Sequence, residues 1–338
     1  MERDYRLTNA RAISCIAVVI LHTFASCSAF EATELQSHVS VIIRNLMFWA
    51  VPCFVMVTGA LLLDPSRKVN YFKVLTRYIP RMLISLAVFT LIFKLTDIAI
   101  GKAAFDAEAF KDMLRAFITG QGQWAHMWYL YMMIALYLII PVLKAFTDHT
   151  GRKEHLTLTF AMMILMSVLP FIMGLFDLQL GFYMPVYTIY PMYLMLGFLL
   201  LNIKHDNRLV MAISIAGFIA GIIALSSLYL NAAPEEQEPL KSLINTYSFP
   251  VTVLGACGMF MLFKTMNKRI KILDLIDQNS FGIYLIHLIP LRIFAVKQIF
   301  DPYDLGLWFV FIAAILIFAV SFIVTALIRK IPYVNKVI

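Results

Sequence analysis

The sequence predicts an all-α, polytopic membrane protein with about ten transmembrane helices and both termini in the cytoplasm. Of the 338 residues, 61% are hydrophobic and 14% charged, and the mean hydropathy is +0.82, whereas soluble domains average about half apolar and a quarter charged. Apolar stretches of about 20 residues recur along the chain, and basic residues gather in every second connector. Short connectors leave no room for a soluble domain, so residues 1–338 form one transmembrane domain.

The expected elements are helices because lipid offers backbone groups no hydrogen-bonding partner. Each expected helix is an apolar stretch long enough to cross the hydrocarbon core. In chain order the expected helices span residues 10–30, 40–63, 77–99, 126–147, 156–175, 183–202, 208–230, 247–266, 279–299 and 306–328.

The charge of the connectors predicts the orientation. With a cytoplasmic N-terminus, 20 of the 28 basic residues lie on the inner side, and the acidic segment PEEQE at 234–238 lies outside. This distribution follows the positive-inside rule for ten spans. In chain order, the inner basic residues are Arg3, Arg6, Arg11, Arg67, Lys68, Lys73, Arg77, Arg81, Lys144, Arg152, Lys153, Lys204, Arg208, Lys264, Lys268, Arg269, Lys271, Arg329, Lys330 and Lys336.

The sequence predicts neither nucleic-acid binding nor a metal or disulfide site. The basic residues form no interleaved basic and aromatic face, so nucleic acid is not an expected partner. The four cysteines lie within apolar segments without CxxC spacing, so we expect neither a metal site nor a disulfide framework.

Arg11 and His22 stand out in the first predicted helix. Eleven residues make about three helical turns, so the two side chains share one face ~16 Å apart. Arg11 alone is equally well explained as an inner-surface anchor. The alternative for His22 alone is a packing hydrogen bond, but ionisable groups within the membrane are rare and usually functional, so the functional reading is favoured. Together they favour a long ligand with an anionic head at Arg11 and a reactive end at His22, a shape that acyl-coenzyme A has. Imidazole suits a general base there.

The pair resembles the signature of the acyltransferase 3 family of bacterial membrane proteins. Four further segments resemble that family in the expected order: FWAVPCFVMVTGALLL (48–63), YFKVLTRYIPRML (71–83), HMWYLYMMIALYLIIPVL (126–143) and SFGIYLIHLIPL (280–291). The resemblance implies transfer of an acyl group, most often acetyl, from cytoplasmic acyl-coenzyme A to a hydroxyl of an extracytoplasmic glycan or lipid-linked sugar. His22 is then the catalytic histidine and Arg11 its coenzyme-side partner.

The basic stretch before the third predicted helix is a candidate for binding the coenzyme's phosphates. Lys73, Arg77 and Arg81 recur every four residues, a spacing that lines one helix face at the inner mouth. An anchor to lipid phosphates explains the stretch equally well without the resemblance. In the second predicted helix, Pro52 and Gly59 are interpreted as allowing a kink and the close approach of a neighbouring helix.

Two further groups are candidates for substrate binding or for support of His22. Gln123, Trp124, His126, Trp128 and Tyr131 lie where the fourth predicted helix enters from the outer side, and either bind a sugar or form an aromatic belt.

In the ninth predicted helix, Ser280, Tyr284 and His287 form one polar stripe, and either support His22 or the coenzyme or join helices by hydrogen bonds.

The favoured hypothesis is therefore a membrane O-acyltransferase, with acetyl as the preferred group, in a bacterial inner membrane. Acetyl-coenzyme A is its co-substrate, and we expect no tightly bound cofactor and no metal. Its partners are the envelope glycan or lipid-linked sugar and membrane lipids, and a homo-oligomer is compatible with the sequence. The competing hypothesis is a transporter or exporter of polysaccharide or lipid-linked sugar, because helices with buried polar residues also line transport pathways.

Overall fold

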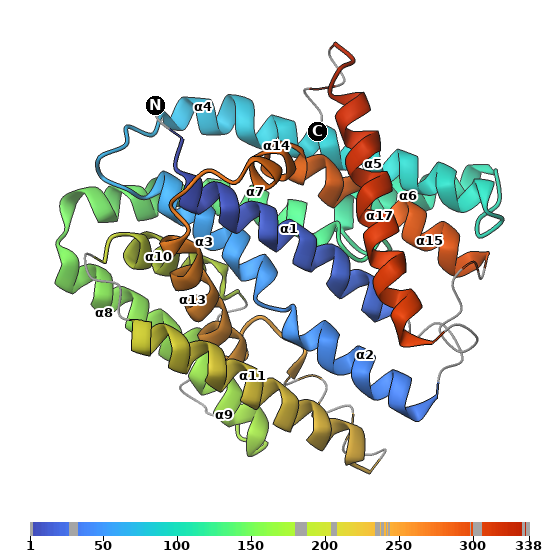
Figure 1. Ribbon diagram of the computed structural model, residues 1–338. Coiled ribbons are helices and arrows are strands. Elements are labelled where there is room, and N and C mark those ends of the chain that lie inside the picture. The colour runs from blue at the N-terminus through green and yellow to red at the C-terminus, as the bar shows by residue number, and fades with distance from the viewer. Residues whose placement is uncertain are drawn as a thin grey trace.

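The computed structural model is all-helical over the residues that it describes, which are 3–26, 33–179, 188–203, 208–233, 244–297 and 306–332 and the single positions 237, 240, 242, 299 and 335. No strand occurs among them (Figure 1). The helices are α1 (Tyr5–Ser26), α2 (Glu34–Leu46), α3 (Ala50–Leu62), α4 (Tyr71–Lys73), α5 (Ile79–Ala99), α6 (Ala107–Thr119), α7 (Trp128–His149), α8 (Arg152–Met163), α9 (Leu169–Leu175), α10 (Tyr190–Leu201), α11 (Arg208–Asn231), α13 (Pro250–Thr265), α14 (Lys271–Ile286), α15 (Leu288–Val296) and α17 (Leu307–Ile328). Two π-helical turns, η2 (Val74–Tyr78) and η3 (Ile164–Val168), join α4 to α5 and α8 to α9.

Every segment predicted to span the membrane contains helix, but three of the ten depart from one straight span. Seven helical runs in the described part are long and apolar enough to cross a membrane. Of the others, α10 has 12 residues and α13 has 16, and the ninth segment is bent by 41° between α14 and α15. Parts of three segments (27–30, 183–187 and 298) lie outside the described residues. The cytoplasmic location of both termini stays a prediction.

Helix α1 lies at the centre of the molecule and packs against α2, α3, α13, α14, α15 and α17 (Figure 1). Small residues such as Ala10, Ala12, Ser14 and Ala17 are buried along it. Small side chains let helix backbones approach closely, which is how helices associate where lipid removes the hydrophobic driving force. The helix that carries Arg11 is therefore positioned by contacts on several sides.

The tightest crossing joins α3 to α10. A Cβ atom placed on Gly59 would lie 2.0 Å from the carbonyl oxygen of Leu194, and one on Gly197 would lie 1.9 Å from that of Met56. The expected close approach at Gly59 is thus confirmed. A turn at Met47–Trp49 separates α2 from α3. Pro52 lies in the first turn of α3, where a missing N–H costs no helical hydrogen bond.

Prolines also lie at or near the other irregularities of the helices, which are one helix break and two π-turns. Pro290 has no N–H for the carbonyl of Ile286, the last residue of α14, so the helix breaks there and His287 lies at the break. The π-turn η2 ends two residues before Pro80, and η3 ends two residues before Pro170. A π-turn shifts the register of the residues before it relative to those after it.

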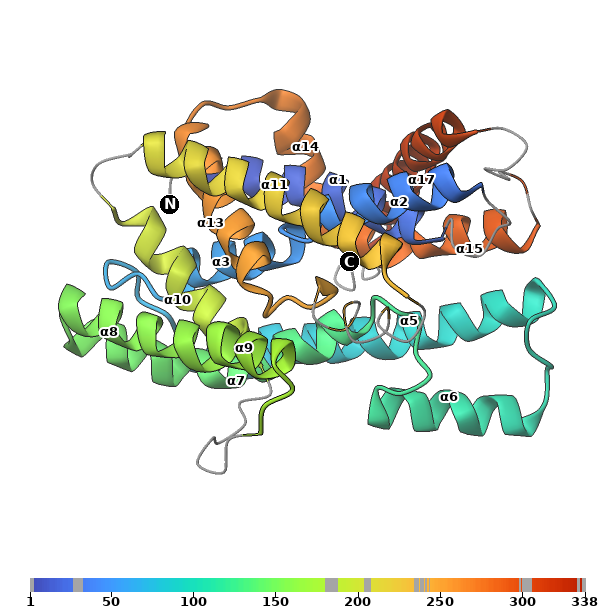
Figure 2. The same ribbon diagram turned by 90° about the horizontal axis from the view of Figure 1, so that it is seen from below.

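Figure 2 shows α5, α7, α8 and α9 along one side of the molecule and α1, α2, α11 and α17 along the other. Helix α6, which the sequence analysis did not predict, packs beside α5. It is short and amphipathic: Ala109 and Ala116 are buried while Lys111 and Asp112 are exposed. Asp106 caps its first turn and Gly120 ends it in the left-handed conformation.

Candidate active site

Three histidines from distant parts of the sequence meet in the bundle. His22 lies in the last turns of α1, His126 lies just before α7, and His287 lies at the break between α14 and α15. The ring centroids are 5.2 Å apart for His22 and His287, 5.4 Å for His126 and His287, and 6.5 Å for His22 and His126. We call these residues the histidine triangle. Each histidine belongs to a different group of predicted site residues, and the structure brings the three groups together at these rings.

Main-chain carbonyls fix the tautomers of two of these rings. His287 Nδ1 lies 2.6 Å from the carbonyl oxygen of Tyr284, and His126 Nε2 lies 3.4 Å from that of Leu285. Because a carbonyl only accepts, each of these nitrogens donates its N–H. The lone pairs of His287 Nε2 and His126 Nδ1 are therefore free, and both atoms are buried without a hydrogen-bonding partner among the described residues.

Aromatic side chains enclose the histidine triangle. The Tyr284 hydroxyl donates to the carbonyl oxygen of His126, and its ring lies 5.3 Å from that of His126 and 5.9 Å from that of His287. Phe93 packs against His126 at 5.2 Å, and Tyr129 packs against Tyr284 at 5.1 Å. Within the described residues, no group of three His, Cys, Asp or Glu side chains is arranged to hold a metal ion.

A cavity of about 1020 Å³, the basic cavity, reaches this enclosure from the end of the bundle that holds Arg11. Four arginines line it: Arg11, Arg77, Arg81 and Arg329. Its other walls include Tyr129 and Tyr284, and the ring of Tyr284 also contacts those of His126 and His287. The cavity therefore joins a cationic mouth to the edge of the histidine triangle.

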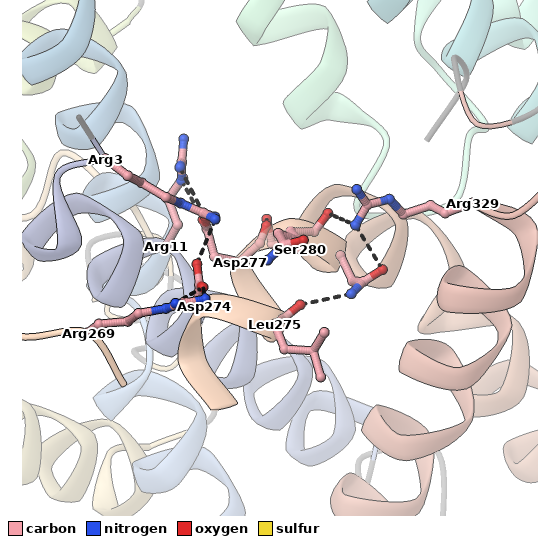
Figure 3. A network of polar contacts seen from close by, with 10 residues as sticks. Arg3, Arg11, Arg269, Asp274, Leu275, Asp277, Ser280 and Arg329 are labelled. Carbon is pink, nitrogen blue, oxygen red and sulfur yellow. Dashed lines mark hydrogen bonds and ion pairs between the residues drawn. The ribbon is translucent and has the colours of Figure 1, made fainter. Parts of the chain in front are cut away.

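Figure 3 shows that Arg11 is paired with a carboxylate from α14. Its Nε lies 2.7 Å from Asp277 Oδ1 and its Nη2 lies 3.2 Å from Oδ2. Arg3 bridges Asp277 at 2.7 Å and Asp274 at 2.6 Å, and Arg269 also binds Asp274 at 2.6 Å. The hydrogen bond to Asp274 and its negative charge raise the pKa of Arg269. Both carboxylates are thus shared by two arginines.

Asp274 and Asp277 are not among the residues predicted from the sequence, although the spacing of Asp277 indicates that it belongs to the site. Asp277 precedes Ser280 by three residues and so extends the predicted polar stripe of Ser280, Tyr284 and His287 by one turn. In the structure Ser280 lines the basic cavity and donates its hydroxyl to the main-chain oxygen of Asp277.

Arg77 and Arg81 present their charge to the basic cavity without a carboxylate partner among the described residues. Arg81 lies 5.2 Å above the ring of Phe281. Lys73 does not line this cavity, and its Nζ lies 5.9 Å over the ring of Tyr78. The π-turn η2 lies between Lys73 and Arg81, so the four-residue spacing does not keep all three on one face.

A second cavity of about 570 Å³, the α5–α6 cavity, contains Gln123 and Trp124. Trp124 stacks on Phe93 at 4.3 Å and donates Nε1–H to Asp97 at 2.9 Å. Gln123 donates to the Thr90 hydroxyl at 2.9 Å. Phe93 lines this cavity and also packs against His126, so one ring separates it from the histidine triangle.

Trp128 and Tyr131 line neither cavity. Trp128 packs against Tyr190 at 5.7 Å and Tyr247 at 5.5 Å. The Tyr131 hydroxyl donates to the carbonyl oxygens at the end of α6, 2.8 Å from that of Phe117. In the structure these two side chains join helices.

The sequence model of the acyltransferase 3 family, described as an acyltransferase domain, matches residues 4–326. No curated protein and no solved structure matches the chain.

Proposed function

The chain belongs to the acyltransferase 3 family, and from that premise we propose that it moves an acyl group, preferably acetyl, from acyl-coenzyme A to a hydroxyl of a cell-envelope glycan or lipid-linked sugar. We place it in a bacterial inner membrane, with the basic cavity facing the cytoplasm. The observation that carries the proposal is that an aromatic ring in contact with the histidine triangle lines each cavity, Tyr284 the basic cavity and Phe93 the α5–α6 cavity.

The donor occupies the basic cavity in this proposal. Arg77 and Arg81 bind its phosphates with charges that no carboxylate of the described residues neutralises. Arg11 contributes those N–H groups of its guanidinium that do not donate to Asp277. From Arg11 to His22 the helix rises ~16 Å, so the pantetheine arm and thioester extend along α1 towards the histidines.

The acceptor approaches from the α5–α6 cavity. Trp124 offers an aromatic face, and Gln123 and Asp97 offer polar groups, a combination that suits a sugar. A sugar hydroxyl that displaces Phe93 from its contact with His126 reaches the histidine triangle. The free lone pairs of His126 Nδ1 and His287 Nε2 are hydrogen-bond acceptors for hydroxyl groups of this acceptor.

His22 acts as the general base. It removes the proton of the attacking hydroxyl while the hydroxyl oxygen forms a bond to the thioester carbon. The carbon–sulfur bond then breaks, and the imidazolium returns the proton to the departing thiolate of coenzyme A. Atoms and charges balance, and the products are the ester and free coenzyme A.

The experiment that tests the proposal uses full-length protein in detergent with acetyl-coenzyme A labelled in the acetyl group. The wild type is expected to release free coenzyme A and pass the label to an envelope glycan fraction or to water. The matched control is His149→Ala, which removes an exposed histidine at the far end of α7. His22→Ala should abolish turnover while His149→Ala keeps it. Wild-type protein that binds but never cleaves acetyl-coenzyme A, with or without the glycan fraction, contradicts the proposal and favours the transporter hypothesis.

A further inference from the structure

A separate cavity of about 490 Å³ lies between α8 and α10. It shares no lining residue with the basic cavity or the α5–α6 cavity. Apolar side chains form most of its walls, among them Leu156 and Phe160 of α8 and Leu196 and Leu199 of α10. We call it the α8–α10 cavity.

The charged side chain that lines the α8–α10 cavity lies at one end of it. Arg152, the first residue of α8, lines that end together with Asn202, which follows the last residue of α10. Met163, the last residue of α8, also lines the cavity, and eleven residues of helix rise ~16 Å. A ligand that matches this shape has a polar head at Arg152 and a hydrocarbon chain along α8.

The polar end carries positive charge. Arg152 is exposed and pairs with no carboxylate among the described residues. Gly151, before α8, has no side chain to cap the first N–H groups of the helix, and a helix N-terminus attracts anions. The nearby carboxylate of Glu154 accepts from the Gly151 N–H at 3.0 Å. Arg152 lines the cavity whereas Glu154 does not, so an anionic head matches this end.

A buried histidine at the same end supplies an independent observation. His155 follows Arg152 by three residues, lines the cavity and is 6% exposed. Its ring lies between Phe146 at 5.6 Å and Phe198 at 5.2 Å. Its Nε2 is buried without a hydrogen-bonding partner among the described residues. A buried polar atom left unpaired is costly, and a polar head group seated beside Arg152 offers it a partner.

We propose that the α8–α10 cavity binds an anionic lipid, with its phosphate at Arg152 and His155 and one hydrocarbon chain between α8 and α10. Basic pockets between membrane helices are known to hold phosphate-bearing head groups. The site is distinct from the proposed active site, so this binding does not depend on acyl transfer.

The test measures lipid binding through the thermal unfolding of full-length protein in a non-ionic detergent. The probe is dioctanoyl phosphatidylglycerol, and the comparison ligands are dioctanoyl phosphatidylcholine and inorganic phosphate. Phosphatidylglycerol should raise the unfolding temperature saturably, because a ligand that binds only the folded state stabilises it. Equal shifts with phosphatidylcholine would overturn the proposal, since they show no preference for a net anionic head group. A full shift with inorganic phosphate alone would overturn it as well, since it indicates an anion site that takes no hydrocarbon chain.

Two variants and one control locate the effect. Arg152→Gln should weaken the affinity for phosphatidylglycerol roughly ten- to hundred-fold, the usual loss for a charge-assisted hydrogen bond. His155→Phe keeps a ring of similar size and should weaken it roughly three- to ten-fold. Arg208→Gln removes an exposed arginine at the first position of another helix, α11, outside the cavity, and should leave the affinity unchanged. An equal loss in Arg152→Gln and Arg208→Gln refutes the site, because surface charge alone then explains the binding.

Discussion

Replacing Arg11 by glutamine separates two roles that the structure gives to this side chain. Its Nε and Nη2 bind Asp277 in α14, and the rest of the guanidinium lines the basic cavity. In one role Arg11 binds the coenzyme, and in the other it only holds α1 to α14. A double-mutant cycle of Arg11→Gln, Asp277→Asn and the combined variant distinguishes the two roles.

The expected magnitudes follow from the geometry. Loss of one charge-assisted contact to phosphate weakens binding by about 1.5–3 kcal/mol, or roughly ten- to hundred-fold. Asp277→Asn acts in the opposite direction, because the Asp277 carboxylate lines the same cavity and repels phosphate. Removing one repelling unit charge from a solvent-accessible cavity gains on the order of 1 kcal/mol, or roughly five-fold in affinity.

The assay is calorimetric titration of coenzyme A into each of the four proteins. If Arg11 binds phosphate, Arg11→Gln should lower the affinity in both the wild-type and the Asp277→Asn background. Stability, measured by thermal unfolding, should fall in both single variants, because Asp277 is only 3% exposed and loses a partner or its charge. The same affinity for coenzyme A in Arg11→Gln and wild type would refute phosphate binding and leave Arg11 only the role of holding Asp277.

Three further outcomes are expected. No concentration of acetyl-coenzyme A should restore the rate of His22→Ala, which falls by about 10²–10⁴-fold if His22 is the general base; recovery to a tenth of the wild-type rate speaks against that role. Lys73→Gln should change coenzyme affinity less than two-fold by the same titration, since Lys73 lies outside the basic cavity, and a ten-fold loss contradicts this reading. Cysteines placed at Ser66 and Lys102 should react with an impermeant reagent from opposite sides of the membrane, because α5 separates them; labelling from one side excludes α5 as a span.

Much of the architecture could be predicted from the sequence because the bilayer imposes strong constraints. Apolar stretches of the required length form helices where lipid leaves backbone groups no other partner. The count of spans was harder to predict, because α10 and α13 are apolar but short, and Pro290 bends the ninth segment. Helix α6 escaped notice because an amphipathic helix of 13 residues has neither the length nor the apolarity of a span.

The candidate site could be predicted only in its separate parts. His22, His126 and His287 each stood out as a polar group in an apolar segment, but periodicity along one helix says nothing about which helices are neighbours. Arg11 pairs with Asp277 of α14. The three-residue spacing between Asp277 and Ser280 was the signal in the sequence that indicates this residue. The prediction that Lys73, Arg77 and Arg81 share one face rests on regular α-helical geometry. The π-turn η2 interrupts that geometry between Lys73 and Arg81.

The pairing of Arg11 with Asp277 has a consequence for how the protein is made. The two residues are 266 positions apart, and at the usual 5–20 residues per second synthesis takes roughly 13 to 53 s to cover that distance. During this interval α1 has entered the membrane while α14 does not yet exist, so the arginine must stay near the lipid surface or find a temporary partner in the insertion machinery. The charge of the first helix is therefore neutralised only late in synthesis, and His287 is synthesised only ten residues after Asp277. A nascent chain released before α14 carries in its first helix an arginine without its Asp277 partner.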